Sequence, residues 1–208
     1  MKKIIALAIA AVCFVGTTFA LDLEVGGRVI LGRNLAEGTF KENASAAKED
    51  KTYDFGGGAY VNFALFGGLG IQAEANYIKS SMNFTKQGDS RETTYEIHTL
   101  DLSPMLWLNL DLWKFTLGFG VGPNFSIPVM SLSDATKAKK EDFTVGLIAG
   151  ADFKFYFTDH LGIVLSGRYI TDWDKKNIEV YGRDTGIPEY TFDRKTIYGG
   201  LGLEWKII

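Results

Sequence analysis

Ten charged side chains lie in long segments of the chain where polar and apolar residues alternate. Five are acids and five are bases: Glu24, Glu74, Asp101, Asp152 and Glu204, and Arg28, Lys114, Lys154, Arg168 and Lys206. Charges that are removed from water are tolerated only when they are paired and hydrogen bonded. Because the two signs balance, the chemistry that these residues predict is a neutral network of ion pairs.

The two histidines are the other candidates for chemistry. Acyl transfer would need a histidine, a serine and a carboxylate within reach of one another. The candidate partners of His98 are Ser80, Ser81 and Glu96, but Leu100 fills the serine position of a His-x-Ser pattern. His98 is expected to face outward near a strand end, and His160 to cap a tight turn. We therefore predict no enzymatic activity, no cofactor, no metal site and no phosphate-binding loop.

The composition of the chain excludes several classes of protein. Its 22 Lys and Arg against 25 Asp and Glu give a net charge of −3, which argues against a nucleic-acid-binding protein. The hydrophobic share of 46% is too high for a disordered chain and typical of one folded domain. Glycine is frequent, at 24 of 208 residues, but without the period of collagen.

Residues 1–20 have the pattern of a secretory signal peptide. Lys2 and Lys3 are followed by an apolar run from Ile4 to Val15, and small residues lie before a cleavage site after Ala20. Cys13, the single cysteine, belongs to this run, so the mature domain over residues 21–208 would contain no disulfide. A lipoprotein with Cys13 as its lipid-bearing residue is the disfavoured alternative. No later stretch has the roughly 18 apolar residues of a membrane-spanning helix.

Period-two alternation predicts eight long strands after the signal peptide. They cover residues 21–33, 54–66, 69–83, 94–110, 113–127, 142–157, 160–172 and 194–208. Tight turns at 67–68, 111–112 and 158–159 alternate with longer polar links, so all tight turns should lie at one end. Such strands exceed the roughly 9–11 residues that cross a bilayer at a tilt.

Two prolines fall inside these predicted strands. Pro104 and Pro123 each remove one hydrogen-bond donor from a ladder. We expect a β-bulge at Pro104, which would shift the inside and outside assignment of residues 94–103 by one position.

A closed transmembrane barrel and a soluble β-sandwich would both alternate in this way. The polar face here is rich in glycine, as in the run Gly118, Gly120 and Gly122, and glycine suits a narrow lumen that must admit large side chains such as Tyr60. Aromatic residues gather in two girdles near the strand ends: Phe66, Trp107, Trp113, Phe155, Phe157 and Trp205, and Phe55, Tyr95, Phe125, Phe143, Tyr169 and Trp173. We predict an all-β fold, an eight-stranded antiparallel up-and-down transmembrane β-barrel whose apolar face meets lipid.

This pattern resembles the small eight-stranded outer-membrane proteins of diderm bacteria, the group of the outer membrane protein A transmembrane domain and the OmpX, OmpW and Opa-like proteins. The end of the chain is similar to the signal read by the barrel-assembly machinery, with Gly202, Trp205 and Ile207 in the matching positions, although Gly200 and Ile208 depart from it. The resemblance implies location in the cell outer membrane. It also implies contact with membrane lipid and a lipopolysaccharide-like glycolipid, and assembly by that machinery.

The expected lumenal ion-pair network consists of Arg28, Glu74, Asp101, Asp152 and Arg168. Either it plugs the barrel, or it gates a narrow path. The first alternative predicts a structural or surface-interaction protein with an occluded lumen, whose charged long links meet an extracellular ligand. The second predicts a narrow channel for small or hydrophobic solutes, as the resemblance to OmpW-like proteins implies, with an apolar entry at Ile127-Pro128-Val129-Met130.

Overall fold

Eight long strands make up most of the chain that the structure describes. The computed structural model describes residues 22–35, 38–40, 47–51, 53–66, 68–86, 92–133, 143–173, 176–178, 190–192 and 194–207. The long strands are β1 (Asp22–Asn34), β4 (Tyr53–Phe66), β5 (Leu69–Lys86), β6 (Glu92–Leu112), β7 (Phe115–Ser133), β8 (Thr144–Tyr156), β9 (Leu161–Asp172) and β12 (Lys195–Lys206). The predicted signal peptide, residues 1–20, lies outside the described residues.

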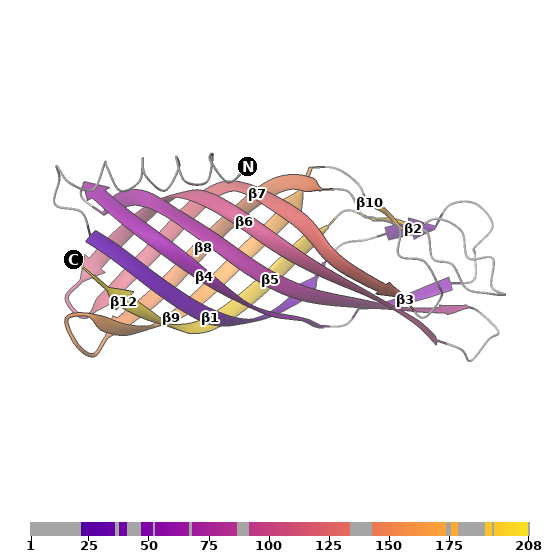
Figure 1. Cartoon of the computed structure of the whole chain (residues 1–208), viewed down its shortest axis with the longest axis horizontal. Coiled ribbons are helices and arrows are strands. Elements are labelled where there is room, and N and C mark those ends of the chain that lie inside the picture. The colour runs from indigo at the N-terminus through magenta and orange to yellow at the C-terminus, as the bar shows by residue number, and fades with distance from the viewer. Residues whose placement is uncertain are drawn as a thin grey trace.

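The strands close into an antiparallel barrel, as the alternation predicts (Figure 1). Each strand pairs with its neighbours in the chain, and β1 pairs with β12 from Glu24–Lys206 to Asn34–Thr196 to complete the ring. Closure gives each long strand a paired neighbour on both sides, as a membrane-spanning sheet requires. No helix among the described residues is long and apolar enough to span a membrane.

Four short strands lie in the long links, where the sequence predicts only polar connections. They are β2 (Gly38–Phe40), β3 (Ala47–Lys51), β10 (Lys176–Ile178) and β11 (Tyr190–Phe192). β3 pairs with the last residues of β5, from Ala47–Lys86 to Lys51–Met82, and β10, β11 and β2 form a separate sheet. The prolonged end of β5 offers backbone groups that a polar segment can satisfy without an apolar face, so the hydrophobic pattern does not predict β3.

One predicted tight turn is displaced. The β6–β7 hairpin turns at Trp113–Lys114 rather than at Asp111–Leu112, because Asp111 pairs with Thr116 and Leu112 with Phe115. The Thr116 hydroxyl donates to Asp111 Oδ1 over 2.6 Å, which fixes this register. Trp113 takes the left-handed conformation that the turn requires, with φ 59°, and its side chain is exposed.

The bulge expected at Pro104 is absent. The β6–β7 register is the same at Leu102–Phe125 and at Leu106–Val121, on either side of the two prolines. Between those pairs the Ser103 hydroxyl donates to Asn124 Oδ1 over 2.7 Å, so a side-chain bond joins the strands where the prolines lack donors. The register instead shifts between His98 and Thr99, nearer the long links. Residues from Thr99 to Ser103 therefore keep simple alternation.

The two faces of the barrel carry the side chains that the alternation assigns to them. Phe119, Leu165 and Leu203 point outward and are 47%, 59% and 58% exposed. Exposed aromatic residues lie near both ends, among them Trp113, Phe157 and Trp205, and Phe55, Phe143, Tyr169 and Trp173. The side chains of Phe66 and Tyr95 are not among those described. The outer surface is thus that of a membrane-spanning barrel.

Trp107 is the error in the predicted girdles. It lies in the lumen with 0% of its surface exposed, because it shares the inward face of β6 with Asp101, Ser103 and Asn109. Its indole Nε1–H donates to Asn109 Oδ1 over 2.9 Å. Across β7, a Cβ added at Gly120 would lie 2.0 Å from Trp107 Cε3, so the glycine makes room for the indole.

Filling that space should destabilise the barrel. We expect Gly120→Val to lower the free energy of unfolding by about 1–3 kcal/mol or more, since an overpacked interior must distort. The measurement is urea denaturation of the folded protein in lipid vesicles, followed by tryptophan fluorescence. The matched control is Gly199→Val on the outer face, where the nearest heavy atom would be 3.8 Å away. Equal urea midpoints for the two variants would contradict a crowded lumen.

Candidate functional site

The middle layer of the lumen is an ion-pair cluster centred on Glu74. Arg168 donates from Nε to Glu74 Oε1 over 3.0 Å and from Nη1 to Asp152 Oδ1 over 2.6 Å. Arg28 forms a second ion pair with Glu74. β5 and β9 lie on opposite sides of the ring, so the pair between Glu74 and Arg168 crosses the lumen. The structure therefore brings together four of the five residues of the predicted network.

Neutral side chains complete the hydrogen bonding of Glu74. Gln72 Nε2 donates to Oε1 over 2.7 Å and Asn76 Nδ2 donates to Oε2 over 3.2 Å. The guanidinium of Arg168 lies 5.0 Å from the centre of the Trp107 ring, close enough for a cation–π interaction. Glu74 is thus a buried carboxylate whose two oxygens are both paired, which is what makes its burial tolerable.

Asp101, the fifth predicted residue, belongs to a separate upper layer nearer the long links. It binds Arg194 through both oxygens, over 2.6 and 3.1 Å, and accepts a hydrogen bond from Ser126 over 2.6 Å. β6 and β12 also lie on opposite sides of the ring, and Arg194 directly precedes β12, so this pair crosses the lumen as well. Arg194 was not among the predicted site residues, although it has the same parity as the inward Thr196 and Tyr198.

A lower layer lies nearer the tight turns. Lys154 of β8 pairs with Glu24 of β1 and, over 2.8 Å, with Glu204 of β12. The hydroxyl of Tyr60 donates to Glu204 over 2.6 Å, and that of Tyr156 donates to Glu24 over 3.0 Å. The sequence predicts Glu24, Lys154 and Glu204 inside the barrel but outside the lumenal ion-pair network.

Two further basic residues that are expected inside the lumen lie at the tight-turn end of the barrel or in the turn itself. Lys114 is exposed in the displaced turn, with its Nζ 5.2 Å from the centre of the Trp113 ring, so its inward assignment is wrong. Lys206 pairs with Asp22 over 3.1 Å at the tight-turn end, where both side chains are partly exposed.

The histidines do not form an acyl-transfer site with serine. His98 lies on the outward side of β6, but it is only 8% exposed because Tyr77 packs against it. The Tyr77 hydroxyl meets His98 Nδ1 at 2.5 Å, and Nε2 lies 3.9 Å from Glu96, which itself pairs with Lys79. Exposed His160 hydrogen bonds through Nδ1 to the Lys206 carbonyl oxygen over 2.9 Å and stacks on Trp205. Within the described ranges, no group of three or more His, Cys, Asp or Glu is placed to hold a metal ion.

The residues of the expected assembly signal lie at the end of β12. Trp205 and Ile207 both point outward and are about half exposed. Gly202 faces the lumen beneath Arg28, since a Cβ there would lie 2.8 Å from Arg28 Cβ. The two hydrophobic residues thus share one face of the last strand, and the glycine occupies the other.

Comparisons with known proteins identify the family of the chain. Residues 4–204 match the family model described as "Outer membrane protein beta-barrel domain". Neisserial surface protein A is similar in structure, with a TM-score of 0.54 and 8% identity over 89% of this chain and 97% of that chain. Ail of Yersinia pestis, solved in complex with the heparin analogue sucrose octasulfate, has a TM-score of 0.48 and 12% identity, over 90% of this chain and 99% of that chain.

At these identities the likeness to solved structures shows the fold alone. No curated protein sequence matches the chain. The family match covers nearly the whole sequence and agrees with the closed barrel and its apolar outer face. The chain belongs to the outer membrane protein β-barrel domain family, and it is a transmembrane protein of the cell outer membrane.

Proposed function

We propose that this barrel has an occluded lumen and serves a structural or surface-interaction role through its long links. The observation that carries the proposal is the burial of the lumenal charges along the whole barrel. Glu24, Lys154, Glu74, Arg168, Asp101 and Arg194 are each at most 5% exposed. A water-filled channel would leave such side chains accessible to solvent, as in the wider porins.

The direction of the ion pairs adds to this support. In the upper layer the pair of Arg194 and Asp101 joins opposite sides of the ring, and in the middle layer the pair of Arg168 and Glu74 does the same, so these two pairs lie across the lumen. In the lower layer Lys154 lies 6.0 Å from the centre of the ring of Tyr60, which belongs to the opposite strand β4. A hydrated ion would have to break pairs in all three layers to pass, and each broken buried pair leaves an uncompensated charge.

A narrow, gated channel for small or hydrophobic solutes is the second candidate. One observation favours it: Arg28 Nε and Nη1 are buried and have no hydrogen-bond partner among the described residues, so they are donors that another arrangement of the middle layer could use. The expected apolar entry lies at the far end of β7, where Ile127 and Val129 point outward and the Met130 side chain is outside the described residues.

The proposed partners follow from the location of the barrel in the outer membrane, from the residues at the end of β12 and from the long links. They are a lipopolysaccharide-like glycolipid in the outer leaflet, the barrel-assembly machinery at Gly202, Trp205 and Ile207, and an extracellular ligand at the long links. The charged residues of those links lie outside the described side chains. We propose no enzymatic activity, because the hydroxyl that meets the His98 ring is that of Tyr77, with its aromatic ring 5.7 Å away, and not a serine.

Conductance separates the two candidates. In a planar bilayer we expect no channel openings from the wild-type barrel, because all three layers cross the lumen. Arg168→Ala should also be silent, since the Lys154 and Arg194 layers remain in place. Lys206→Ala, at the end of the barrel, is the control for charge removal. Reproducible openings of the wild type would refute occlusion. Openings of Arg168→Ala alone among the variants would show that the other two layers do not block the lumen, and would support the gated channel.

The middle layer should also stabilise the fold. Arg168→Ala leaves Glu74 and Asp152 buried with fewer partners, and removal of one partner from a buried ion pair costs about 3–5 kcal/mol. We expect a correspondingly lower urea midpoint in lipid vesicles, while the variant still folds and keeps the compact, unboiled form on gels. Lys206→Ala should unfold like the wild type, because its pair with Asp22 is partly exposed. Equal midpoints for the two variants would show that the middle layer contributes no stability.

A further inference from the structure

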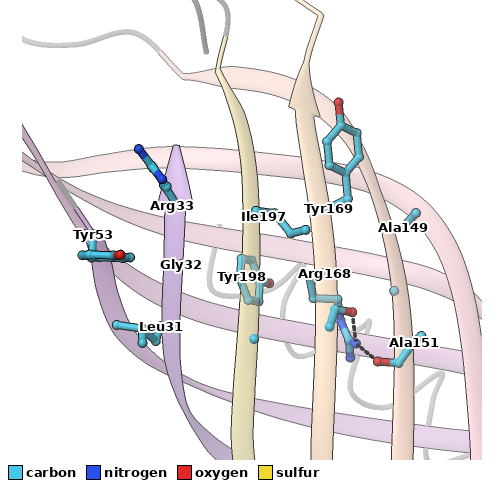
Figure 2. Close-up of a pocket in the computed structure, with 13 residues that line it drawn as sticks. Leu31, Gly32, Arg33, Tyr53, Ala149, Ala151, Arg168, Tyr169, Ile197 and Tyr198 are labelled. Carbon is cyan, nitrogen blue, oxygen red and sulfur yellow. Dashed lines mark hydrogen bonds between the residues drawn. The ribbon is translucent and has the colours of Figure 1, made fainter. Parts of the chain in front are cut away.

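A groove of about 650 Å³ opens on the outer surface of the barrel, where β1, β12, β9 and β8 lie side by side (Figure 2). This volume is within the roughly 300–1,000 Å³ of small-molecule sites. The outward residues that line it are Leu31, Arg33, Tyr53, Ala149, Ala151, Gly167, Tyr169, Ile197 and Gly199. The groove is thus separate from the lumen and on the side that meets the membrane.

The groove arises because one row of outward positions lacks side chains in its middle. Leu31 pairs with Gly199, Gly199 with Gly167, and Gly167 with Ala151, so these residues run across four strands. A Cβ at Gly167 would meet nothing within 4 Å. The next row toward the tight turns carries Leu201, Leu165 and Phe153, all exposed. The next row toward the long links carries Ile197 and Tyr169. Large apolar side chains therefore bound a floor of backbone and methyl groups.

The floor is held in place from inside the barrel. Arg168 Nη1 donates to the carbonyl oxygens of Gly167 over 2.9 Å and Ala151 over 3.1 Å, the contacts dashed in Figure 2. Arg168 is itself fixed by Glu74 and Asp152. Because the ion pairs fix the backbone beneath the groove, its shape is preformed and does not depend on a ligand to open it.

Cationic and aromatic groups stand at one end of the groove. Arg33 lines the groove near the long-link end of β1. Lys195 lies beyond the lining, two residues from the lining Ile197 on β12, and is exposed. Among the described side chains neither forms an ion pair. Figure 2 shows Arg33 and Tyr169 at the same end of the pocket, directed toward the strand ends. Tyr53 and Tyr169 are exposed there too, at the level where aromatic residues mark the membrane interface.

We propose that this groove binds one acyl chain of an anionic phosphate-bearing lipid of the outer leaflet, with the phosphate at Arg33 and Lys195. The site faces hydrocarbon along its length, so an acyl chain is the occupant that fills its apolar part. Arg33 and Lys195 lie at the level of the membrane interface, where lipid phosphates lie, so their positive charges complement the negative phosphate. The inference rests on the proposed contact with an outer-leaflet glycolipid and assigns it a site, and it holds whether or not the lumen conducts.

Electron paramagnetic resonance with spin-labelled lipid tests the proposal. The folded full barrel is placed in phosphatidylcholine vesicles with a trace of chain-labelled phosphatidylglycerol or chain-labelled phosphatidylcholine. The wild type should hold a motionally restricted lipid population that prefers phosphatidylglycerol by about fivefold or more, as expected for cations at a headgroup. Arg33→Gln with Lys195→Gln should abolish the preference. Lys79→Gln, which removes a rim cation already paired with Glu96, should retain it.

Filling the groove gives the second arm of the experiment. Gly167→Leu with Gly199→Leu should remove the preferential population, while Gly27→Leu, at an open outward position outside the groove, should not. Heat-dependent gel mobility establishes that each variant is folded. An unchanged preference in the filled variant, or no preference in the wild type, would overturn the proposal. So would a filled variant whose only change is a smaller oligomer on native gels, since a second copy would then occupy the groove. None of these outcomes bears on conductance.

Discussion

The lumen of an eight-stranded barrel is too narrow to hold bulk water, and this constraint governs the rest of the structure. Every polar group that points inward must find its partner among other inward side chains. In this chain charged groups meet across the ring: Arg168 with Glu74, and Arg194 with Asp101. Inward glycines follow from the same constraint, because Gly120 and Gly26 lie where the rings of Trp107 and Tyr60 must pass.

Glu74 is the residue on which the middle of the barrel converges. It binds two arginines from β1 and β9 and two amides from its own strand. Because these donors arrive from different strands, the carboxylate ties together parts of the ring that share no backbone ladder. A cluster of this kind fixes which strands face one another across the lumen, in addition to neutralising charge.

Most of the barrel could be predicted from alternation, and the candidate site only in part. Parity along a strand gives the face of each residue, and so it placed Arg28, Glu74, Asp152 and Arg168 inside. It does not give height along the barrel axis, which depends on the stagger between strands. For that reason Asp101 was grouped with the wrong arginines, and Arg194 was missed. Trp107 lies close to a strand end, which predicts a girdle position, but it has the same parity as the inward Asp101 and Asn109 of β6 and so lies in the lumen.

The remaining errors come from local chemistry that hydrophobicity does not record. The turn at Trp113–Lys114 is fixed by the Thr116–Asp111 hydrogen bond and not by glycine. The two prolines lie in neighbouring strands and disturb the same short stretch of ladder, which a lumenal bond between Ser103 and Asn124 bridges, so no bulge is needed. In both places a hydrogen bond between side chains holds the two strands in register, where the sequence pattern predicts a backbone feature, a tight turn or a bulge.

Arg168 links the inside of the barrel to its outside. Its guanidinium pairs with Glu74 and Asp152 in the lumen, and the same group holds the carbonyls of Gly167 and Ala151 at the base of the outer groove. A closed barrel wall is one residue thick, so a side chain that fixes the backbone from within also fixes the surface that lipid meets. The ion pairs that cross the lumen are then also the reason that a glycine-lined depression in the wall can keep its shape.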